Sequence, residues 1–304
     1  MHNYVDKLID NLPDYIKNQT SPTKLDIVID GGVFNGSYLV GALYFLKEME
    51  KRNYVIVDRI SGCSIGSIAA FLYTIDALDL FEKFYGMACN NLKQDFNLKF
   101  LKELKTYVKD RVPEDICKKV NGKLFVTFYN IKKGKKIVKS KFKRLDSIIT
   151  SLIRSSFVPF LIDGNLLLER KYMDGINPFV FQPEKDKKIL YLDLFGYDKI
   201  TNLLNVKNEK TNFHRILSGL LDIHNFYIKQ SNTPMCSYVN DWSLLNKLHD
   251  FIKYIVERSF IISIQLFISI KKYIPPDIEN TVLFEIFKNI VYDIYVSLLK
   301  NYCL

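Results

Sequence analysis

The residues with the clearest potential for chemistry surround Ser64, in the run Gly62-Cys63-Ser64-Ile65-Gly66. Glycines two positions before and after a serine are typical of a nucleophile elbow, a tight turn between a strand and a helix that projects the hydroxyl. Larger side chains at these two positions would collide with the adjoining strand and helix. The pattern predicts a nucleophilic serine, with the amide of Ile65 at the next helix N-terminus facing the developing negative charge.

A second glycine-rich run, DGGVFNG, begins at Asp30, and its first glycine lies 33 residues before Ser64. Its spacing does not fit a dinucleotide-binding loop, and no Gly-Lys-Ser/Thr follows. Adjacent amides without bulky side chains suit an oxyanion hole. We therefore expect Gly31, Gly32 and Val33 to supply donors, although the Cβ of Val33 restricts the loop. Asp30 is expected to brace it.

Both runs follow a predicted strand and open a predicted helix. Apolar patterning indicates strands at 25–29 and 54–60 and helices at 37–51 and 68–80. This alternation predicts an α/β fold with a mostly parallel central sheet flanked by helices, in which ligands bind at the carboxyl ends of the strands. Both candidate loops then meet at one edge of the sheet.

The rest of the chain divides by composition. Further strands are predicted at 124–129, 136–138 and 189–194, and a hairpin arm at 165–173. Residues 81–120 and most of the chain after 211 are predicted to be helical, with a boundary where Pro234 interrupts the pattern. We expect three parts: a leader helix at 1–24, a catalytic domain at 25–232 and a helical C-terminal extension at 233–304.

Together with a later Tyr-x-Asp-Gly, Tyr172 to Gly175, these motifs resemble the patatin-like phospholipase family over roughly residues 25–195. The family loop usually reads Asp-Gly-Gly-Gly-x-Arg/Lys-Gly, where this chain has Val33 and Asn35. The adiponutrin-type branch also lacks the basic residue and carries a Phe-x-Gly-x-Tyr-x-x-Gly run, which this chain matches from Phe34 to Gly41. The resemblance implies a three-layer α/β/α fold and lipid acyl hydrolysis.

The residue that takes the serine proton is the next question. A histidine would complete an ordinary triad, but the four histidines of the chain lack strand-end context and are expected to be surface or packing residues: His2, His214, His224 and His249. The resemblance implies a Ser–Asp dyad instead, and its matching position is Asp174. Asp163 lies in an Asp-Gly-Asn hairpin turn and is assigned a structural role, and Asp193 is a weaker alternative. The resemblance also implies that the stretch 154–160, RSSFVPF, packs around the site.

The expected chemistry is that of a serine carboxylic-ester hydrolase. Asp174 accepts the proton of Ser64, which attacks an ester carbonyl, and water hydrolyses the acyl-enzyme. We expect phospholipid or glycerolipid substrates and neither a metal nor a cofactor. The alternative is a catalytically impaired lipid-binding or membrane-associated scaffold on the same fold, because Val33 departs from the family loop.

Charge and apolar patterning indicate the partners. A net charge of +10 favours anionic surfaces, but no nucleic-acid motif accompanies it, so a peripheral membrane or lipid-droplet surface is expected instead. The stretch 254–273 is predicted either to lie in such an interface or to pack as a buried helix. With a second amphipathic helix at 281–302 it could cover the site, dock to a partner or form a dimer.

The N-terminus has no signal-peptide pattern, and five irregularly spaced cysteines indicate reduced thiols, so we expect an intracellular protein that is cytoplasmic or peripheral to a membrane.

Overall fold

The computed structural model describes residues 1–195, 205–206, 211–271, 273, 286, 289–290, 293–294 and 297. All statements below concern these residues. The predicted helix at 281–302 lies largely outside them.

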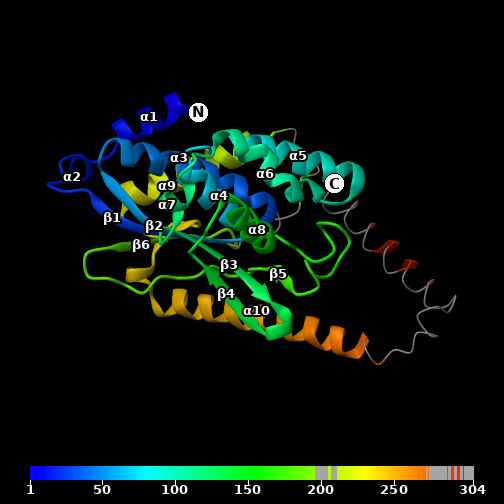
Figure 1. The fold of residues 1–304 in the computed structure, drawn as a ribbon. Coiled ribbons are helices and arrows are strands. Elements are labelled where there is room, and N and C mark those ends of the chain that lie inside the picture. Colours follow the sequence, from blue (N-terminus) through cyan, green and yellow to red (C-terminus); the bar gives the residue numbers. More distant parts are fainter. Residues whose placement is uncertain are drawn as a thin grey trace.

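A mixed sheet forms the centre of the molecule, in the order β4-β3-β2-β1-β6-β7, with β5 paired to β3 (Figure 1). The central strands β3, β2, β1 and β6 run parallel, and β4, β5 and β7 are antiparallel to their neighbours. The predicted α/β class with a mostly parallel centre is confirmed. The strands are β1 (Thr23–Ile29), β2 (Val55–Cys63), β3 (Leu124–Asn130), β4 (Lys135–Lys139), β5 (Tyr172–Asp174), β6 (Lys188–Leu192) and β7 (Cys236–Tyr238).

Helices lie on both sides of this sheet (Figure 1). One side carries α3, α4, α8 and α9, and α10 runs along the other. The helices are α1 (His2–Asp10), α2 (Asp14–Lys17), α3 (Gly36–Lys51), α4 (Ile65–Thr74), α5 (Leu80–Asp95), α6 (Leu104–Val108), α7 (Ile116–Val120), α8 (Leu145–Ser155), α9 (Phe213–Lys229) and α10 (Leu244–Lys271). Short 3₁₀ turns are η1 (Val33–Asn35), η2 (Lys99–Glu103), η3 (Lys109–Arg111), η4 (Ile131–Lys133) and η6 (Val239–Asp241).

Close packing of α3 against α9 fixes the first layer. A Cβ at Gly41 would lie 1.9 Å from the carbonyl oxygen of Ile216, and one at Gly219 would lie 1.9 Å from that of Tyr38. The two helix backbones therefore touch where they cross, which no larger residue would allow. The leader packs on the same layer, since α1 contacts α3 and α9 and buries Val5 and Ile9.

The strand arrangement brings two distant segments to one point. β2 pairs with β3 as far as Cys63 opposite Thr127, where β2 ends. β5 then continues beside β3, with Asp174 opposite Phe128, the next residue. The ends of β2 and β5 therefore meet side by side at the same position along β3.

Several boundaries differ from the expectation. α4 begins at Ile65, three residues before the predicted start, because the first turn of the helix includes the residue after Ser64. The predicted hairpin arm at 165–173 is mostly irregular, with a single bridge between Leu168 and Tyr172. β7 lies within 233–304 and adds a strand to the sheet. In the part of the chain described, no helix combines the length and apolar character needed to cross a membrane.

Candidate active site

Ser64 lies at the turn between β2 and α4 in a strained backbone conformation, with φ 50° and ψ −132°. Non-glycine residues rarely adopt positive φ, and such strain is found mainly at functional sites. The flanking glycines permit the turn: a Cβ at Gly62 would lie 2.5 Å from the carbonyl oxygen of Gly66, and one at Gly66 would lie 2.3 Å from that of Asp30. The turn thus has the geometry expected of a nucleophile elbow.

Three hydroxyl groups hold the backbone of Ser64. Its N–H donates to Ser155 Oγ at 3.0 Å. Its carbonyl oxygen accepts from Ser67 Oγ at 2.7 Å and from Ser156 Oγ at 3.1 Å. Ser155 Oγ in turn donates to the carbonyl oxygen of Thr127 at 2.6 Å, on β3. These bonds offset the strain of the turn, and the stretch 154–160 does pack around the site as expected.

The same segment holds Asp174. The amide of Asp174 donates to the carbonyl oxygen of Phe157 at 3.1 Å, and the amide of Gly175 donates to the carbonyl oxygen of Ser155 at 3.3 Å. A Cβ at Gly175 would lie only 2.2 Å from the carbonyl oxygen of Thr127. Glycine is therefore required after Asp174, because β5 passes so close to β3.

The carboxyl group of Asp174 has a strongly raised pKa. Burial raises its pKa from 3.8 to about 7, against the lowering effect of hydrogen bonding from the Ser64 hydroxyl and the Gly175 amide. No side chain or backbone group in the described parts of the chain hydrogen-bonds to Asp174 Oδ1. A carboxylate with a pKa near neutrality is well matched to general-base catalysis.

The glycine loop lies against the serine. A Cβ at Gly31 would come within 3.0 Å of Ser64 Cβ. The amide of Gly31 donates to Asp30 Oδ1 at 3.1 Å, which confirms Asp30 as the brace of the loop. The N–H of Gly31, which we expected to be an oxyanion donor, is thus engaged within the loop in this structure. Within the described residues no hydrogen bond engages the amides of Gly32, Val33 or Ile65.

Val33 occupies the third loop position in a strained conformation, with φ 43°. Glycine would adopt this backbone at little cost, whereas a β-branched residue adds roughly 1–3 kcal/mol of strain. Its neighbour Asn35 is fully buried. Asn35 Nδ2 donates to the carbonyl oxygen of Leu194, and Asn35 Oδ1 accepts from Arg215 Nη1 at 2.9 Å. The position that is basic in most of the family thus binds a buried arginine from α9.

An apolar cavity opens at Ser64. Its free space is about 590 Å³, a figure that includes open solvent at its mouth. The sequence did not reveal this cavity, because its walls come from helices and turns far apart in the chain. They are Val33, Phe34, Ser64, Ile65, Ile68, Phe81, Phe84, Tyr85, Ala88, Leu98, Phe100, Leu101, Ser156 and Val158.

The other candidate bases lie elsewhere. Asp163 forms an ion pair with Lys102, and Asp193 accepts from Lys253 at 3.0 Å. His224 packs edge-on against an aromatic ring, and burial lowers its pKa. Among the described residues no histidine lines the Ser64 cavity, and no cluster of His, Cys, Asp and Glu could hold a metal ion.

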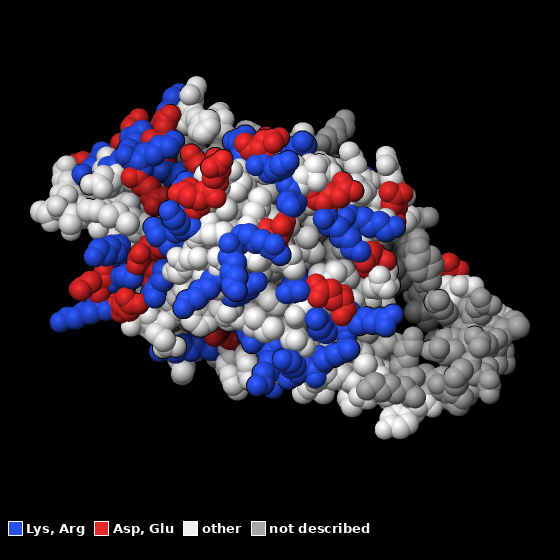
Figure 2. Space-filling model, in the orientation of Figure 1, with Lys and Arg blue, Asp and Glu red and all other residues white. Residues whose placement is uncertain are grey.

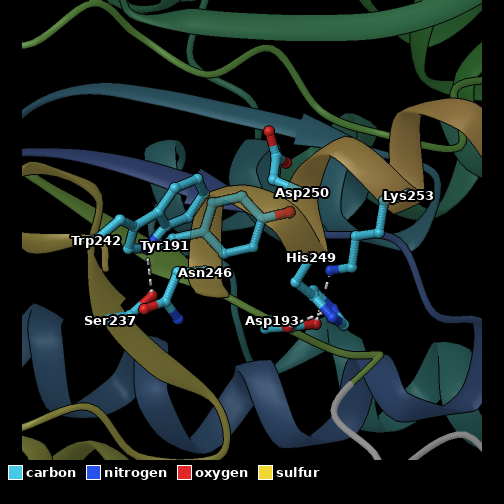
Figure 3. A pocket seen from close by; sticks show the side chains of 8 residues that line it. All are labelled: Tyr191, Asp193, Ser237, Trp242, Asn246, His249, Asp250 and Lys253. Carbon is cyan, nitrogen blue, oxygen red and sulfur yellow. Dashed lines mark hydrogen bonds and ion pairs between the residues drawn. The ribbon is translucent and has the colours of Figure 1, made fainter. Parts of the chain in front are cut away.

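A second, polar pocket lies under the N-terminal half of α10 (Figure 3). Asp193, His249 and Lys253 point toward one another there, and His249 Nε2 is 3.9 Å from Asp193. Lys253 also reaches Asp30 at 2.8 Å, which sequence reasoning missed because 223 residues separate the two. The only sequence signal for this contact was the spacing of charged residues along an otherwise apolar helix.

Residues 27–179 match the family described as patatin-like phospholipase. The chain belongs to this family. Within it, two curated proteins named omega-hydroxyceramide transacylase, from Mus musculus and Homo sapiens, are each 26% identical to this chain over 144 residues. The match covers 45% of this chain and 24% and 27% of theirs.

A Mus musculus protein named 1-acylglycerol-3-phosphate O-acyltransferase Pnpla3 is 25% identical over 154 residues, or 47% of this chain and 37% of that protein. This patatin-like chain thus aligns with well under half the length of these relatives. A solved structure, the heterodimeric complex ExoU–SpcU from the type III secretion system of Pseudomonas aeruginosa, has a chain similar at TM-score 0.38 and 14% identity. That similarity covers 69% of this chain and 52% of the other.

Proposed function

We propose that this protein is a lipid acyl hydrolase that cleaves carboxylic esters through a Ser64–Asp174 dyad. The observation that carries the proposal is the meeting of three features at one point: a strained serine, a buried carboxyl group that interacts with its hydroxyl, and an apolar cavity. Asp174 accepts the proton as Ser64 Oγ attacks the ester carbonyl, and the acyl chain lies in the cavity.

The negative charge that develops on the carbonyl oxygen needs donors. We assign them to the amides of Gly32, Val33 and Ile65, and Gly31 to the brace with Asp30. Collapse of the tetrahedral intermediate releases the alcohol, which takes the proton from Asp174. Water then attacks the acyl-enzyme with Asp174 again as the base, Asp174 returns that proton to Ser64 Oγ as the ester bond breaks, and the free acid leaves.

The relatives' names raise transfer to a second acceptor as an alternative to hydrolysis. They are called a transacylase and an acyltransferase, which pass an acyl group to an alcohol. The acyl-enzyme is common to both outcomes, so the acceptor decides between them. Incubation with a labelled phospholipid, with and without a lysolipid acceptor, separates free fatty acid from transferred product. We expect free acid to dominate.

A fluorophosphonate probe tests the dyad directly, because it reacts with activated serines. We expect labelling of the wild type, none of Ser64→Ala, and labelling slowed at least a hundredfold in Asp174→Asn. Asp163→Asn is the matched control and keeps the wild-type rate, since Asp163 pairs with Lys102 away from the site. An unlabelled wild type in lipid micelles would favour the alternative, a scaffold impaired at Val33.

The docking surface for lipid is assigned to α10. Its outer face exposes apolar side chains, whereas Glu257 on its inner face is fully buried. The exposed residues are Leu244, Leu245, Leu248, Phe251, Ile252, Ile255, Phe260, Ile262, Leu266, Phe267 and Ile270. Such a helix faces an apolar medium on its outer side.

Charge beside this helix favours an anionic bilayer as that medium. Gln265 on α10 donates to the carbonyl oxygen of Ile131, which anchors the lysine-rich turn between β3 and β4 against the helix. Lys132, Lys133 and Lys135 are exposed there, and Figure 2 shows basic side chains gathered along this lower edge. Basic residues next to an exposed apolar helix favour anionic lipid.

A further inference from the structure

The inner face of α10 carries two charges into the interior. The side chain of Lys253 is 13% exposed and that of Glu257 is fully buried. The two residues are four apart, one turn of the same helix face. Buried charges are costly unless paired, so their partners indicate what the helix holds in place.

Lys253 pairs with the brace of the glycine loop. Its Nζ donates to Asp30 Oδ2 at 2.8 Å and to Asp193 Oδ1 at 3.0 Å (Figure 3 shows the second contact). Tyr191 Oη also donates to Asp30 Oδ2, at 3.3 Å. The other oxygen of Asp30 accepts the amide of Gly31. One carboxylate therefore joins the ammonium group of α10 to the loop beside Ser64.

Glu257 makes the matching contact on the other side of the site. It accepts from Asn177 Nδ2 at 2.9 Å and from the Asn177 amide at 3.3 Å. Asn177 lies three residues after Asp174. α10, which lies outside the family match, thus contacts the segments next to both the glycine loop and the base.

We propose that Lys253 is a positioning residue for the glycine loop: its ammonium group fixes the Asp30 carboxylate in the geometry that binds the Gly31 amide. This proposal rests on the hydrolase function above. Removal of Lys253 leaves a fully buried carboxylate behind a loop that must stabilise a second negative charge. Asp30 then takes up a proton or moves, and the loop amides lose their alignment.

The main variant is Lys253→Met, which keeps the aliphatic length and removes the charge. With a soluble short-chain ester we expect kcat to fall about tenfold to a hundredfold and KM to change less than threefold, because the loop acts on the transition state. In the conservative variant Lys253→Arg we expect kcat to stay within about fivefold of the wild type, since the adjacent polar pocket leaves room for a guanidinium group.

Two further variants separate positioning from mere docking of α10. In Asp30→Asn/Lys253→Met, the amide oxygen still accepts the Gly31 N–H and needs no counter-charge, so we expect at least a tenfold recovery over Lys253→Met. Gln265→Ala removes a hydrogen bond from the same helix to the β3–β4 turn and keeps kcat. An unchanged kcat in Lys253→Met, or equal losses in Gln265→Ala, overturns the proposal.

Hydrogen exchange gives a readout that needs no catalysis. The Gly31 amide is protected in the wild type and in Gln265→Ala, and we expect it to exchange at least tenfold faster in Lys253→Met. If the wild type fails to react with the fluorophosphonate while this difference persists, the hydrolase function falls and the positioning role stands. If labelling succeeds and Gly31 exchange is unaltered by Lys253→Met, the positioning role alone is wrong.

Discussion

At the scale of single residues, Asp174 combines burial with the proton-accepting role that we propose for it. Burial raises its pKa to about 7, so much of the group carries a proton at neutral pH. Only the ionised form can accept the serine proton. The proposed base thus titrates near neutral pH.

We expect the rate of fluorophosphonate labelling to rise with pH through an apparent pKa near 7. This rise in rate follows the ionisation of Asp174. Protonation of Asp30, whose pKa is raised to about 6, adds to the loss of labelling in acid. Labelling rates between pH 5 and 9 measure it. Asp163→Asn should reproduce the wild-type curve, and a flat curve across this range would argue against a carboxylate base.

The same shift affects stability. The folded-state pKa of Asp174 lies above its unfolded value of 3.8, so the folded protein binds more protons between these values and loses stability as pH rises toward 7. Above pH 7 the pKa shift of Asp174 lowers the free energy of unfolding by its full amount, about 4 kcal/mol from the size of the shift.

Asp174→Asn removes this titration. We expect its thermal midpoint to exceed that of the wild type at pH 8 and to match it near pH 4, measured by scanning calorimetry. Asp30 titrates in both proteins and cancels in the difference. A gap between the two midpoints that stays constant with pH would contradict the assignment of the shift to Asp174.

At the scale of elements, β5 positions Asp174, the proposed base. It has three residues and pairs with β3 directly beyond the point where β2 ends. The closeness of this pairing is visible at Gly175, where a Cβ would overlap the Thr127 carbonyl group. A short strand can thus fix a side chain to within the tolerance that catalysis needs.

Gly175→Ala should push β5 away from β3 and displace Asp174. We expect kcat on a soluble ester to fall about a hundredfold, as a shift of about 1 Å can cause. Gly86→Ala on α5 is the control, because nothing lies within 4 Å of a Cβ there. Near-normal turnover by folded Gly175→Ala would show that β5 does not set the position of the base.

Sequence patterns predicted the elements around Ser64 well, because apolar strands and helices alternate clearly there. They predicted a hairpin arm at 165–173, which includes the first two residues of β5, but not the pairing of β5 with β3, since three residues are too few for a period to emerge. The hydrogen bonds of Ser155 and Ser156 to the Ser64 backbone depend on tertiary contact. A serine in a helix end has no pattern that distinguishes such a role.

At the scale of the whole molecule, α10 departs from the usual arrangement of an amphipathic helix. An apolar stripe on a helix normally faces the core, and this rule supported a buried helix as one prediction for 254–273. In the structure the buried face carries Lys253 and Glu257 as well as the apolar Ile261 and Ile264, and much of the remaining apolar surface faces outward. Periodicity could locate the stripe but could not give its direction.

Vesicle sedimentation tests the apolar part of this surface. Phe251→Glu/Ile255→Glu should weaken binding to phosphatidylserine-containing vesicles at least tenfold, because charge is excluded from the acyl boundary. Leu221→Glu on α9 has similar exposure on another element and serves as the control. A dimer in solution that these substitutions convert to monomer would show that a second copy covers the face instead.

The lysine-rich turn adds a charge-dependent part. Lys132→Glu/Lys133→Glu should reduce binding to anionic vesicles by tenfold or more, at about 1 kcal/mol per basic residue, and leave weak binding to neutral vesicles unchanged. Lys118→Glu/Lys119→Glu on α7 gives the same change of net charge elsewhere, at exposed positions. Equal losses for both pairs would indicate a general charge effect without a defined surface.

The segment from Ser155 to Phe157 has a consequence for thermal motion. It binds the backbone on both sides of the proposed dyad, through Ser155 and Ser156 to Ser64 and through two carbonyl groups to Asp174 and Gly175. When this segment drifts, the nucleophile and the base are carried in the same direction. The distance between Ser64 and Asp174 should therefore fluctuate less than the position of either residue. The reactive distance is then kept even when the surrounding structure moves.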